Sequence, residues 1–458
     1  MEAQDVHIVL ADDDIEADDR LLCADALDLP PAPHIGEALD LLLEYTARHR
    51  IDAVLAESEA ALLPGALLNH RLGLRGLSLR GALLATDKWL QRRALAAAGV
   101  PGPDFQLARC AADVHRFAAE RARRAGGTGF PLVLKAVASS MSRNVVKVSG
   151  PCEVDAAVAA LQERLASAPD VRRCVAFARL AGLDPGCDPE RDLLVEEWLD
   201  GDPVEVDGLY LDQRNPGQRN PGSGPRSSSA EPWSFGVTEQ LLSAGPVFFM
   251  EGYLFPSDRP AAQARAIERA ALDAARALDL RGTAFSIELR ARGNRCSVIE
   301  VNARLGQDDG FAEMFRRGLG DYPLQLWLSA LAGGGPPAPR PVRGHHAVAY
   351  VNHYTGGRVV RTSGGPAASA RSSTTSPPDA EAFTLRAERT DGLALGLLAP
   401  PGAALPAPGD PDFEPHVAVA LASHASSSRA ALAEARAALA GLDVSVQPDG
   451  ARALPVAL

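Results

Sequence analysis

The stretch FSIELRARGNRCSVIEVNARLG, residues 285–306, decides the fold of this chain. The runs TAFSIEL and CSVIEVN have the alternation of β-strands, and ARGNR joins them as a turn, so we expect a hairpin. Glu288 and Glu300 each stand near a strand end, and Asn302 follows Glu300 by two residues, which puts these last two on one face. Two carboxylates and an amide on one sheet face form a hard-oxygen site suited to Mg²⁺.

Arg304 lies two residues beyond Asn302 and so on the same face, where a guanidinium can bind phosphate or carboxylate. The alternative interpretation of the hairpin is a surface element with solvated charges. It explains poorly why Glu288 and Glu300 stand in otherwise apolar strands. We therefore favour the metal site.

Lysine is almost absent from the chain. Only Lys88, Lys135 and Lys147 are lysines, and the other 43 of the 46 basic residues are arginines. Lysine binds phosphate as a compact point charge, so replacement by arginine is not conservative in a tight phosphate cleft. We expect Lys88 and Lys135 at nucleotide phosphates and assign no role to Lys147.

The surroundings of these lysines predict local structure. FPLVLK, which ends at Lys135, is followed by the small polar stretch AVASSMSRN and by VVKV, which indicates strand, phosphate-covering loop and strand. Thr86 can cap the helix that carries Lys88, and Gly99 with the following prolines ends it. The arginines of RRAL and RARR are expected on solvated helix faces: Arg92, Arg93, Arg121, Arg123 and Arg124.

Composition excludes several classes of protein. A chain of 458 residues suggests two to four domains, and its net charge of −12 argues against a nucleic-acid partner. No uncharged apolar run of 18 residues predicts a membrane span, and the N-terminus lacks the pattern of a signal peptide. The six cysteines have no CxxC spacing, as is typical of reduced thiols, so we expect a cytoplasmic location.

The pattern along the chain predicts a mixed α/β and α+β protein of three domains: 1–85, 86–338 and 339–458. In the first, VHIVLA and IDAVLAE are expected to form buried parallel strands, with EALDLLLEYTARHR as an amphipathic helix between them. In the last, HHAVAYVNHY and HVAVALAS are expected as strands and SRAALAEARAAL as a helix. Stretches rich in Pro, Gly and Ser at 212–232 and 363–379 are expected to be flexible.

A second group of functional residues lies in DLLVEEWLDGDPVEVDGLY. An apolar strand leads into Glu197, Trp198 and Leu199, which we expect to link two lobes. Backbone groups of such a linker can hydrogen-bond an adenine edge, and the later carboxylate of Glu205 can accept from ribose hydroxyls. An acidic and aromatic strand end without any ligand is the alternative.

Taken together and in this order, the motifs resemble the ATP-grasp superfamily. The match runs from Lys88 through FPLVLK and VEEWLDG to the specific pattern E-x11-E-x-N-x-R, which ends at Arg304. The resemblance implies an N-terminal α/β domain, a two-lobed core that holds ATP between its lobes, and a small C-terminal α+β domain. It also implies phosphate contacts from Lys88, Lys135, Ser139 and Ser140, adenine contacts from Glu197, Trp198 and Leu199, ribose contact from Glu205, and Mg²⁺ or Mn²⁺ on Glu288, Glu300 and Asn302.

Two departures from the family pattern stand out. The loop after Lys135, ASSMSRN, lacks the usual glycines, so we expect a stiffer loop. The N-terminal domain also lacks a first β-α unit, which fits either a compact variant or a truncated start.

GVTEQLLSAGPVFFMEGYLFPS resembles the segment that amino-acid ligases place near their first substrate. Alternation places Glu251 and Tyr253 on one strand face toward the cleft. By this resemblance Glu251 would hold an α-ammonium group, while Tyr253 stands where such ligases often have histidine. Glu251 as a plain strand end is the alternative.

These observations predict an ATP-dependent carboxylate–amine ligase, with an amino acid as the carboxylate substrate and an amine as the second. An acylphosphate would form, and Arg304 with Lys135 would stabilise the transferring charge. One alternative is a biotin-carboxylase-like enzyme, although no biotinyl-carrier signature appears. The other is a non-catalytic nucleotide-binding homologue. We expect small-molecule partners and no nucleic acid or membrane, with a homodimer as a possible assembly.

Overall fold

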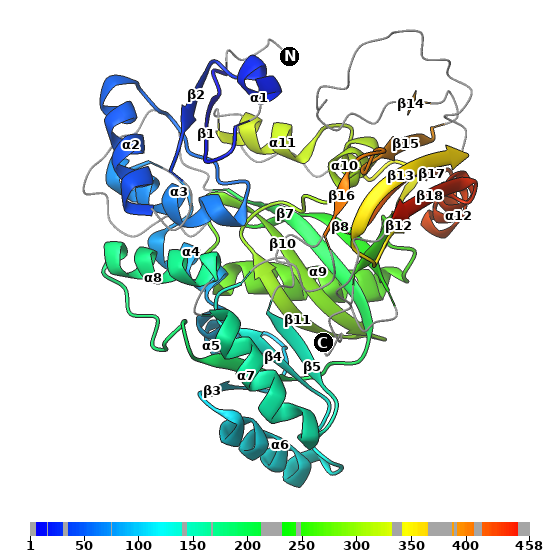
Figure 1. The fold of residues 1–458 in the computed structure, drawn as a ribbon. Coiled ribbons are helices and arrows are strands. Elements are labelled where there is room, and N and C mark those ends of the chain that lie inside the picture. The colour runs from blue at the N-terminus through cyan, green and yellow to red at the C-terminus, as the bar shows by residue number, and fades with distance from the viewer. Residues whose placement is uncertain are drawn as a thin grey trace.

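The computed structural model describes residues 6–15, 17–30, 35–74, 76–139, 144–165, 168–211, 231–243, 249–331, 341–364, 387–388, 392–406 and 415–447. These residues form helices and four β-sheets (Figure 1), which confirms the predicted mixed fold class. No helix in the described part of the chain has the length and apolar character that a membrane span requires. Most of the stretch at 212–232 and of that at 363–379 lies outside the described residues.

The N-terminal region pairs two short strands in parallel, β1 (Val9–Asp12) and β2 (Asp25–Asp28). The predicted helix is present as α2 (Ile35–Arg48). The prediction of a strand at IDAVLAE is wrong, because residues 51–57 have no strand assignment and β1 has another partner. An apolar run becomes a strand only where a neighbour accepts its hydrogen bonds. The remaining elements here are α1 (Ala17–Leu22), α3 (Glu59–Leu72) and α4 (Leu79–Thr86).

A small lobe follows, at the bottom of Figure 1. Its antiparallel sheet has the order β3-β6-β4-β5, and the predicted strand–loop–strand around Lys135 is present as the β4–β5 pair. Alternate residues of β4 are buried against α6 and α7, so Lys135 points to the opposite face. The elements of this lobe are β3 (Phe105–Ala108), α6 (Ala111–Ala125), β4 (Leu132–Ala136), β5 (Val145–Val148), η1 (Pro151–Glu153), α7 (Val154–Leu165) and β6 (Leu193–Glu197). Helix α8 (Pro169–Ala181) comes between α7 and β6 in the chain but packs on α2, α3 and α4 of the N-terminal region.

Helix α5 (Lys88–Ala97) precedes this lobe and presents Lys88 as its first residue. The predicted cap is wrong by one position. The side chain of Asp87, rather than that of Thr86, accepts a hydrogen bond from the N–H of Leu90, while Thr86 belongs to α4 and donates to the carbonyl of Ala82. A carboxylate at the N-cap also suits the positive end of the helix dipole.

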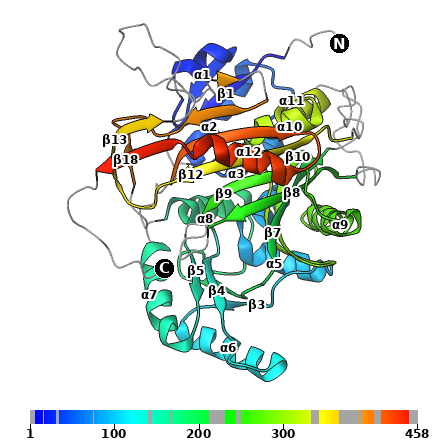
Figure 2. The same cartoon turned by 90° about the vertical axis from the view of Figure 1, so that its right-hand side faces the viewer.

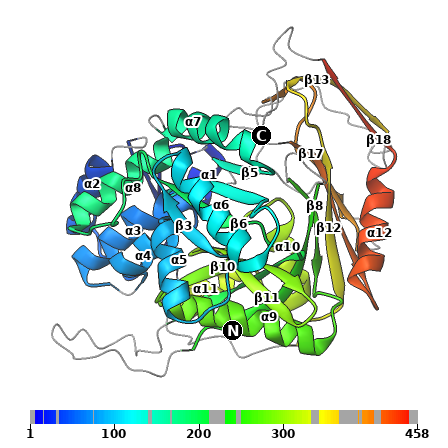
Figure 3. The same cartoon turned by 90° about the horizontal axis from the view of Figure 1, so that it is seen from below.

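The second lobe is built on a nine-stranded sheet of order β11-β10-β7-β8-β9-β12-β17-β15-β14. One face of it packs on α9, which runs beside β10 and β11 in Figure 3. The other face carries apolar residues of β7 and β9 under α10. The elements are β7 (Asp202–Tyr210), β8 (Trp233–Leu242), β9 (Met250–Phe255), α9 (Ala261–Ala277), β10 (Thr283–Arg292), β11 (Arg295–Asn302), α10 (Phe311–Leu319) and α11 (Pro323–Ser329).

The C-terminal strands extend this same sheet, so the sheet does not end at the predicted boundary of 338 and 339. Helix α12 covers β12 and β17 on the α9 side, as Figure 2 shows, and this helix and both strands lie where the sequence predicts them. The elements are β12 (His345–Asn352), β13 (Gly357–Gly364), β14 (Ala387–Glu388), β15 (Ala394–Leu397), β16 (Ala404–Leu405), β17 (His416–His424), α12 (Ser428–Leu439) and β18 (Leu442–Gln447).

Arg92 links the small lobe to the large sheet through buried contacts. Its side chain is only 4% exposed, so the prediction that it lies on a solvated helix face is wrong. The guanidinium pairs with Glu196 on β6 and donates to the carbonyl of Val298 on β11 at 2.9 Å. The second carboxylate oxygen of Glu196 lies 2.8 Å from Nζ of Lys135, which completes a buried triad.

We predict that Glu196→Gln destabilises the protein by roughly 3–5 kcal/mol, because it leaves Arg92 and Lys135 buried without their counter-charge. The matched control is Glu197→Gln, which removes a partly exposed pairing with Arg121 and should cost under about 1 kcal/mol. The free energies of unfolding from urea titrations test the difference. Equal losses of unfolding free energy in the two variants would contradict the role of Glu196 as the buried counter-charge of Arg92 and Lys135.

The same triad has a pH signature. Burial alone would raise the pKa of Glu196, but Arg92 and Lys135 outweigh it and lower the pKa from 4.5 to about 2. Because the folded-state pKa is depressed, the stabilisation is fully present above pH 4.5 and is lost as the pH falls through about 2. The difference in stability between wild type and Glu196→Gln should therefore shrink only on acidification below pH 4.5.

Candidate active site

Three neighbouring strands carry a row of carboxylates on one face of the large sheet. Glu288 on β10 stands directly opposite Glu205 on β7 and opposite Glu300 on β11. Asn302 is two residues beyond Glu300, opposite Ser286, and therefore faces the same side. The structure thus brings the predicted set of Glu288, Glu300 and Asn302 together, while their role as metal ligands stays a prediction.

The charges in this row are unevenly compensated. Burial raises the pKa of Glu288 to about 8, and the carboxylates of Glu300 and Glu205 add to the effect. Burial also acts to raise the pKa of Glu300, but Lys88 and Lys135 outweigh it and the pKa falls below its ordinary value. A divalent cation at this row would favour the ionised form of both carboxyls.

The donor set fits a hard cation such as Mg²⁺ or Mn²⁺, which prefers carboxylate and amide oxygens. Among the described residues, no three His, Cys, Asp or Glu side chains form a group that could hold a metal ion. The predicted set is consistent with that finding, because its third oxygen comes from the amide of Asn302.

Both predicted phosphate lysines lie beside the acidic row. Lys88 pairs with Glu300, and its Nζ donates to the carbonyl of Ser139 at 2.7 Å. Lys135 forms an ion pair with Glu196. Both lysines are buried, and Lys135 acts electrostatically on Glu288 and Glu300. Positive charge from one lobe therefore meets negative charge from the other.

The predicted phosphate loop is described in part. Ser139 is buried, and its hydroxyl has no hydrogen-bond partner within the described residues. Ser140 lies outside the described residues. An unpartnered buried hydroxyl beside Lys88 is compatible with the predicted phosphate contact.

The predicted adenine linker joins β6 to β7. The backbone N–H groups of Glu197 and Trp198 donate to the carbonyls of Asp104 and Pro131, so these two donors are already engaged. Nζ of Lys147 lies 3.9 Å from the centroid of the Trp198 ring, a cation–π contact that places this lysine beside the linker. Leu199 follows in the same linker and is half-buried.

Glu205 lies inside the acidic row, away from this linker. Its carboxylate accepts from Ser286 and, at 2.9 Å, from Gln240. Burial and the adjacent Asp207 raise its pKa well above the ordinary value. The predicted ribose contact stays a prediction, and the position adds a carboxylate to the acidic row.

Asp207 is a buried site residue that the sequence reasoning missed. It lies two residues beyond Glu205 on β7 and opposite Ser286, so the alternation argument used for Asn302 could have found it. Its Oδ1 accepts from the N–H of Gly306 at 3.1 Å. Burial raises its pKa to about 7, although that hydrogen bond and Arg304 act in the opposite direction.

Arg304 joins the site to the N-terminal region. Its Nη2 lies 3.4 Å from a carboxylate oxygen of Glu59, at the start of α3, and its Nη1 donates to the carbonyl of Leu305 at 2.8 Å. Arg304 also acts electrostatically on Glu288 and Asp207, so it lies near the acidic row.

Glu251 does not share a face with Tyr253, so that prediction is wrong. The β8–β9 ladder shifts between Leu241 and Leu242, which leaves Glu251 as an extra residue in a β-bulge. Its side chain is 42% exposed and lies 4.0 Å from Arg436 on α12, the helix on the opposite side of the sheet. Tyr253 faces the α10 side of the sheet, where its hydroxyl donates to Asp308.

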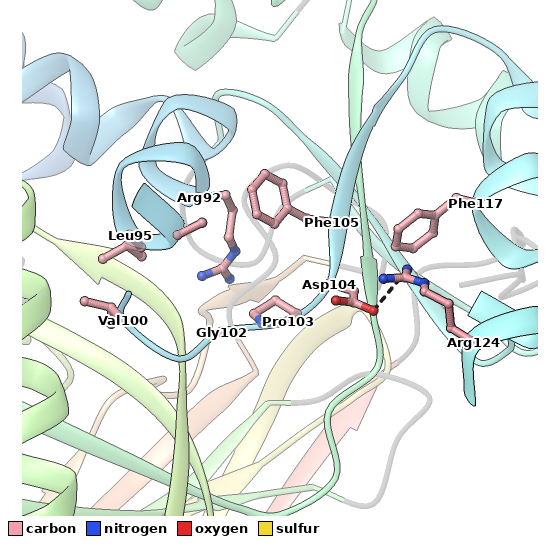
Figure 4. A pocket seen from close by; sticks show the side chains of 10 residues that line it. Arg92, Leu95, Val100, Gly102, Pro103, Asp104, Phe105, Phe117 and Arg124 are labelled. Carbon is pink, nitrogen blue, oxygen red and sulfur yellow. Dashed lines mark ion pairs between the residues drawn. The ribbon is translucent and has the colours of Figure 1, made fainter. Parts of the chain in front are cut away.

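Two cavities lined by described residues lie away from the predicted site residues. One of about 280 Å³ lies between α5, β3 and α6, where Arg92 and Arg124 flank Phe105 and Arg124 pairs with Asp104 (Figure 4). The other, of about 290 Å³, lies between β8 and α9 beside Glu268. The site is therefore identified by its side chains and charges.

Comparison with known proteins gives structural matches only. No family model and no curated protein matches the sequence. An L-amino acid ligase from Bacillus licheniformis has a similar structure, with a TM-score of 0.69 and 19% identity over 93% of this chain and 89% of that one. The biotin carboxylase domain of 2-oxoglutarate carboxylase from Hydrogenobacter thermophilus has a TM-score of 0.62 and 14% identity over 96% and 86%.

N5-carboxyaminoimidazole ribonucleotide synthetase from Thermotoga maritima is also similar, with a TM-score of 0.61 and 12% identity over 96% of this chain and 93% of that one. All three similarities extend over nearly the whole chain. Together with the lysines and carboxylates that meet between two lobes here, they lead to one conclusion: this chain has the ATP-grasp fold.

Proposed function

We propose that the protein is an ATP-dependent carboxylate–amine ligase that forms an amide bond through an acylphosphate, with an amino acid as the carboxylate substrate. One observation carries the proposal. Two buried lysines lie beside the row that contains Glu288 and Glu300: Lys88 pairs with Glu300, and Lys135 acts electrostatically on both carboxylates. A polyphosphate with its divalent cation has the complementary charges for both sides.

The similar structures support ATP and Mg²⁺ as the cofactors. The Hydrogenobacter biotin carboxylase domain was solved as a dimer with MgADP and bicarbonate, and the Bacillus protein is an L-amino acid ligase. By extension, we propose that this chain binds a nucleotide and small-molecule substrates, and that Glu288, Glu300 and Asn302 hold Mg²⁺. We also propose that the protein forms a homodimer. A cytoplasmic location is proposed because all six cysteines are free thiols.

The residues divide the chemistry between them. Bound Mg²⁺ supplies charge neutralisation for the phosphates. Lys88 exchanges Glu300 for phosphate oxygen, and Lys135 offsets charge from the β4 strand. A carboxylate oxygen of the first substrate attacks the terminal phosphorus and ADP leaves. The amine then attacks the acyl carbon and phosphate leaves, while Arg304 stabilises the oxyanion.

A direct test is the release of phosphate from ATP over pairs of amino acids, each pair compared with its single members. Hydroxylamine in place of the amine traps an acylphosphate as a hydroxamate, so the first substrate can be identified without the second. Bicarbonate belongs in the same screen, because similarity to a carboxylase favours it as the second candidate substrate. Phosphate release with bicarbonate alone, and with no amino acid, would contradict the amino-acid ligase.

For the metal site, we predict that Glu300→Gln keeps the fold and lowers Mg²⁺-dependent turnover on the order of 10²–10³-fold, since a neutral amide cannot offset the cation. The matched control is Glu268→Gln, on α9 at the opposite face of the sheet, which should retain full turnover. Steady-state rates of both variants and of wild type at saturating ATP test this prediction. Normal turnover of the Glu300 variant would exclude the assigned ligand.

For the phosphate lysines, we predict that Lys135→Arg lowers ATP turnover by about tenfold or more, which is roughly 1.4 kcal/mol of barrier. The wider guanidinium must fit a buried position that Glu196 and Arg92 already crowd. Lys147→Arg is the control, and it should remain near wild type because arginine also stacks on an indole ring. Similar behaviour of the two variants would remove the argument for Lys135.

A further inference from the structure

Strand β11, which carries Glu300 and Asn302, is an end strand of the nine-stranded sheet. Within the described part of the chain it pairs only with β10, so the backbone N–H and C=O groups of its outer edge need other partners. Helix α5 supplies them. The guanidinium of Arg92 donates to the carbonyls of Val298 and Ile299. The helix therefore lies against β11 where a further strand would otherwise pair.

Gln91 on the same helix continues this contact at Val301. Its Nε2 donates to the carbonyl of Val301 at 2.9 Å, and its Oε1 accepts from the N–H of the same residue at 3.0 Å. A paired strand holds the two backbone groups of one residue in the same way. Nε2 also donates to the carbonyls of Leu84 and Ala85 at 3.3 and 3.2 Å, and the side chain is only 2% exposed. Gln91 thus joins α4, α5 and β11 in the protein interior.

The hydrogen bonds of Gln91 require an amide. The N–H of Val301 needs an acceptor, whereas the carbonyls of Val301, Leu84 and Ala85 need donors. A glutamine side chain has one acceptor oxygen and a nitrogen with two hydrogens, so it serves both. Ionised glutamate offers acceptors alone, lysine offers donors alone, and methionine offers neither. Because the position is buried, a replacement of these kinds leaves backbone groups unsatisfied.

The residue that Gln91 holds lies between two proposed metal ligands. Val301 separates Glu300 from Asn302 in the sequence. Lys88, which pairs with Glu300, stands three residues before Gln91 and so about one helical turn away. One helix therefore holds both the backbone of β11 and one of its carboxylates. Since Mg²⁺ demands near-ideal octahedral geometry, a small displacement of this strand would misplace the oxygens of both ligands.

We infer that Gln91 is a positioning residue, which holds β11 against α5 and so sets the geometry in which Glu300 and Asn302 bind a divalent cation. The inference rests on the proposed function and extends it to a side chain that acts through the backbone of Val301. Loss of a purely structural contact would weaken nucleotide binding with and without the cation alike. Loss of Gln91 weakens the part of nucleotide binding that depends on the cation, as happens when the partners behind metal ligands are removed.

The experiment measures the Kd of ADP in the presence of Mg²⁺ and in the presence of EDTA, for wild type and for Gln91→Met. Methionine keeps the length of the side chain and removes both hydrogen-bonding groups. We expect the Kd with Mg²⁺ to rise on the order of 10- to 100-fold, the usual cost of removing a partner behind a metal ligand. The Kd with EDTA should stay near that of wild type, because both phosphate lysines remain. Circular dichroism and a urea titration establish that the variant is folded.

Gln162→Met is the matched control. Gln162 on α7 bridges the carbonyls of Arg109 and Arg191 at 3.1 and 3.0 Å, so the same substitution removes similar hydrogen bonds away from β11. Its two ADP constants should equal those of wild type. Gln91→Asn is a second variant, since asparagine keeps a polar amide but is one methylene too short to reach β11. It should show the same selective loss.

Three outcomes would overturn the positioning role and leave the ligase intact. They are an unchanged Kd with Mg²⁺ in the folded Gln91 variants, an equal rise of Kd with Mg²⁺ and with EDTA, and failure of both Gln91 variants to fold, which would show a structural role alone. A wild type that binds no ADP, or binds it no more tightly with Mg²⁺ than with EDTA, would overturn the proposed function and the inference together.

Discussion

The pairing of lysines with carboxylates is the constraint on which the site depends. Lys88 pairs with Glu300 across a sequence separation of more than two hundred residues, and Lys135 pairs with Glu196. Because these side chains are largely buried, neither set of charges is tolerated alone. Under the proposed function, nucleotide and cation exchange one set of ion pairs for another: phosphates take the lysines and the cation takes the carboxylates. The lobes are therefore prepared electrostatically before the ligand arrives.

Strand register does the rest of the positioning. Glu205, Glu288 and Glu300 meet only because β7, β10 and β11 are aligned at these residues, and a slip by one position would turn each carboxylate to the apolar face under α9. The apolar residues on that face, such as Val206 and Ile287, hold the register. The packing of the core and the assembly of the site are thus one constraint.

Features encoded within a few residues were predictable, and those set by distant contacts were not. The hairpin that carries Glu288 and Glu300 follows from the alternation of apolar residues and from the turn between the strands. Helix α12 follows from the helical pattern of its own residues. The burial of Arg92 depends on Glu196 and on carbonyls of β11, which no local pattern reveals. The bulge that turns Glu251 away depends likewise on β8, since a strict alternation cannot foresee an extra residue. Asp207 was accessible to the alternation argument and was overlooked.

The scarcity of lysine has a practical consequence for chemistry performed on the protein. Two of the three lysine side chains are buried among the site carboxylates, and the third lies against Trp198. The remaining basic side chains are guanidinium or imidazole groups, which amine-selective acylating reagents leave largely unmodified. Such a reagent finds few targets apart from these three lysines and the N-terminal amine. The pattern of acylation, mapped by mass spectrometry with and without nucleotide, thereby becomes a footprint of one site in a chain of 458 residues.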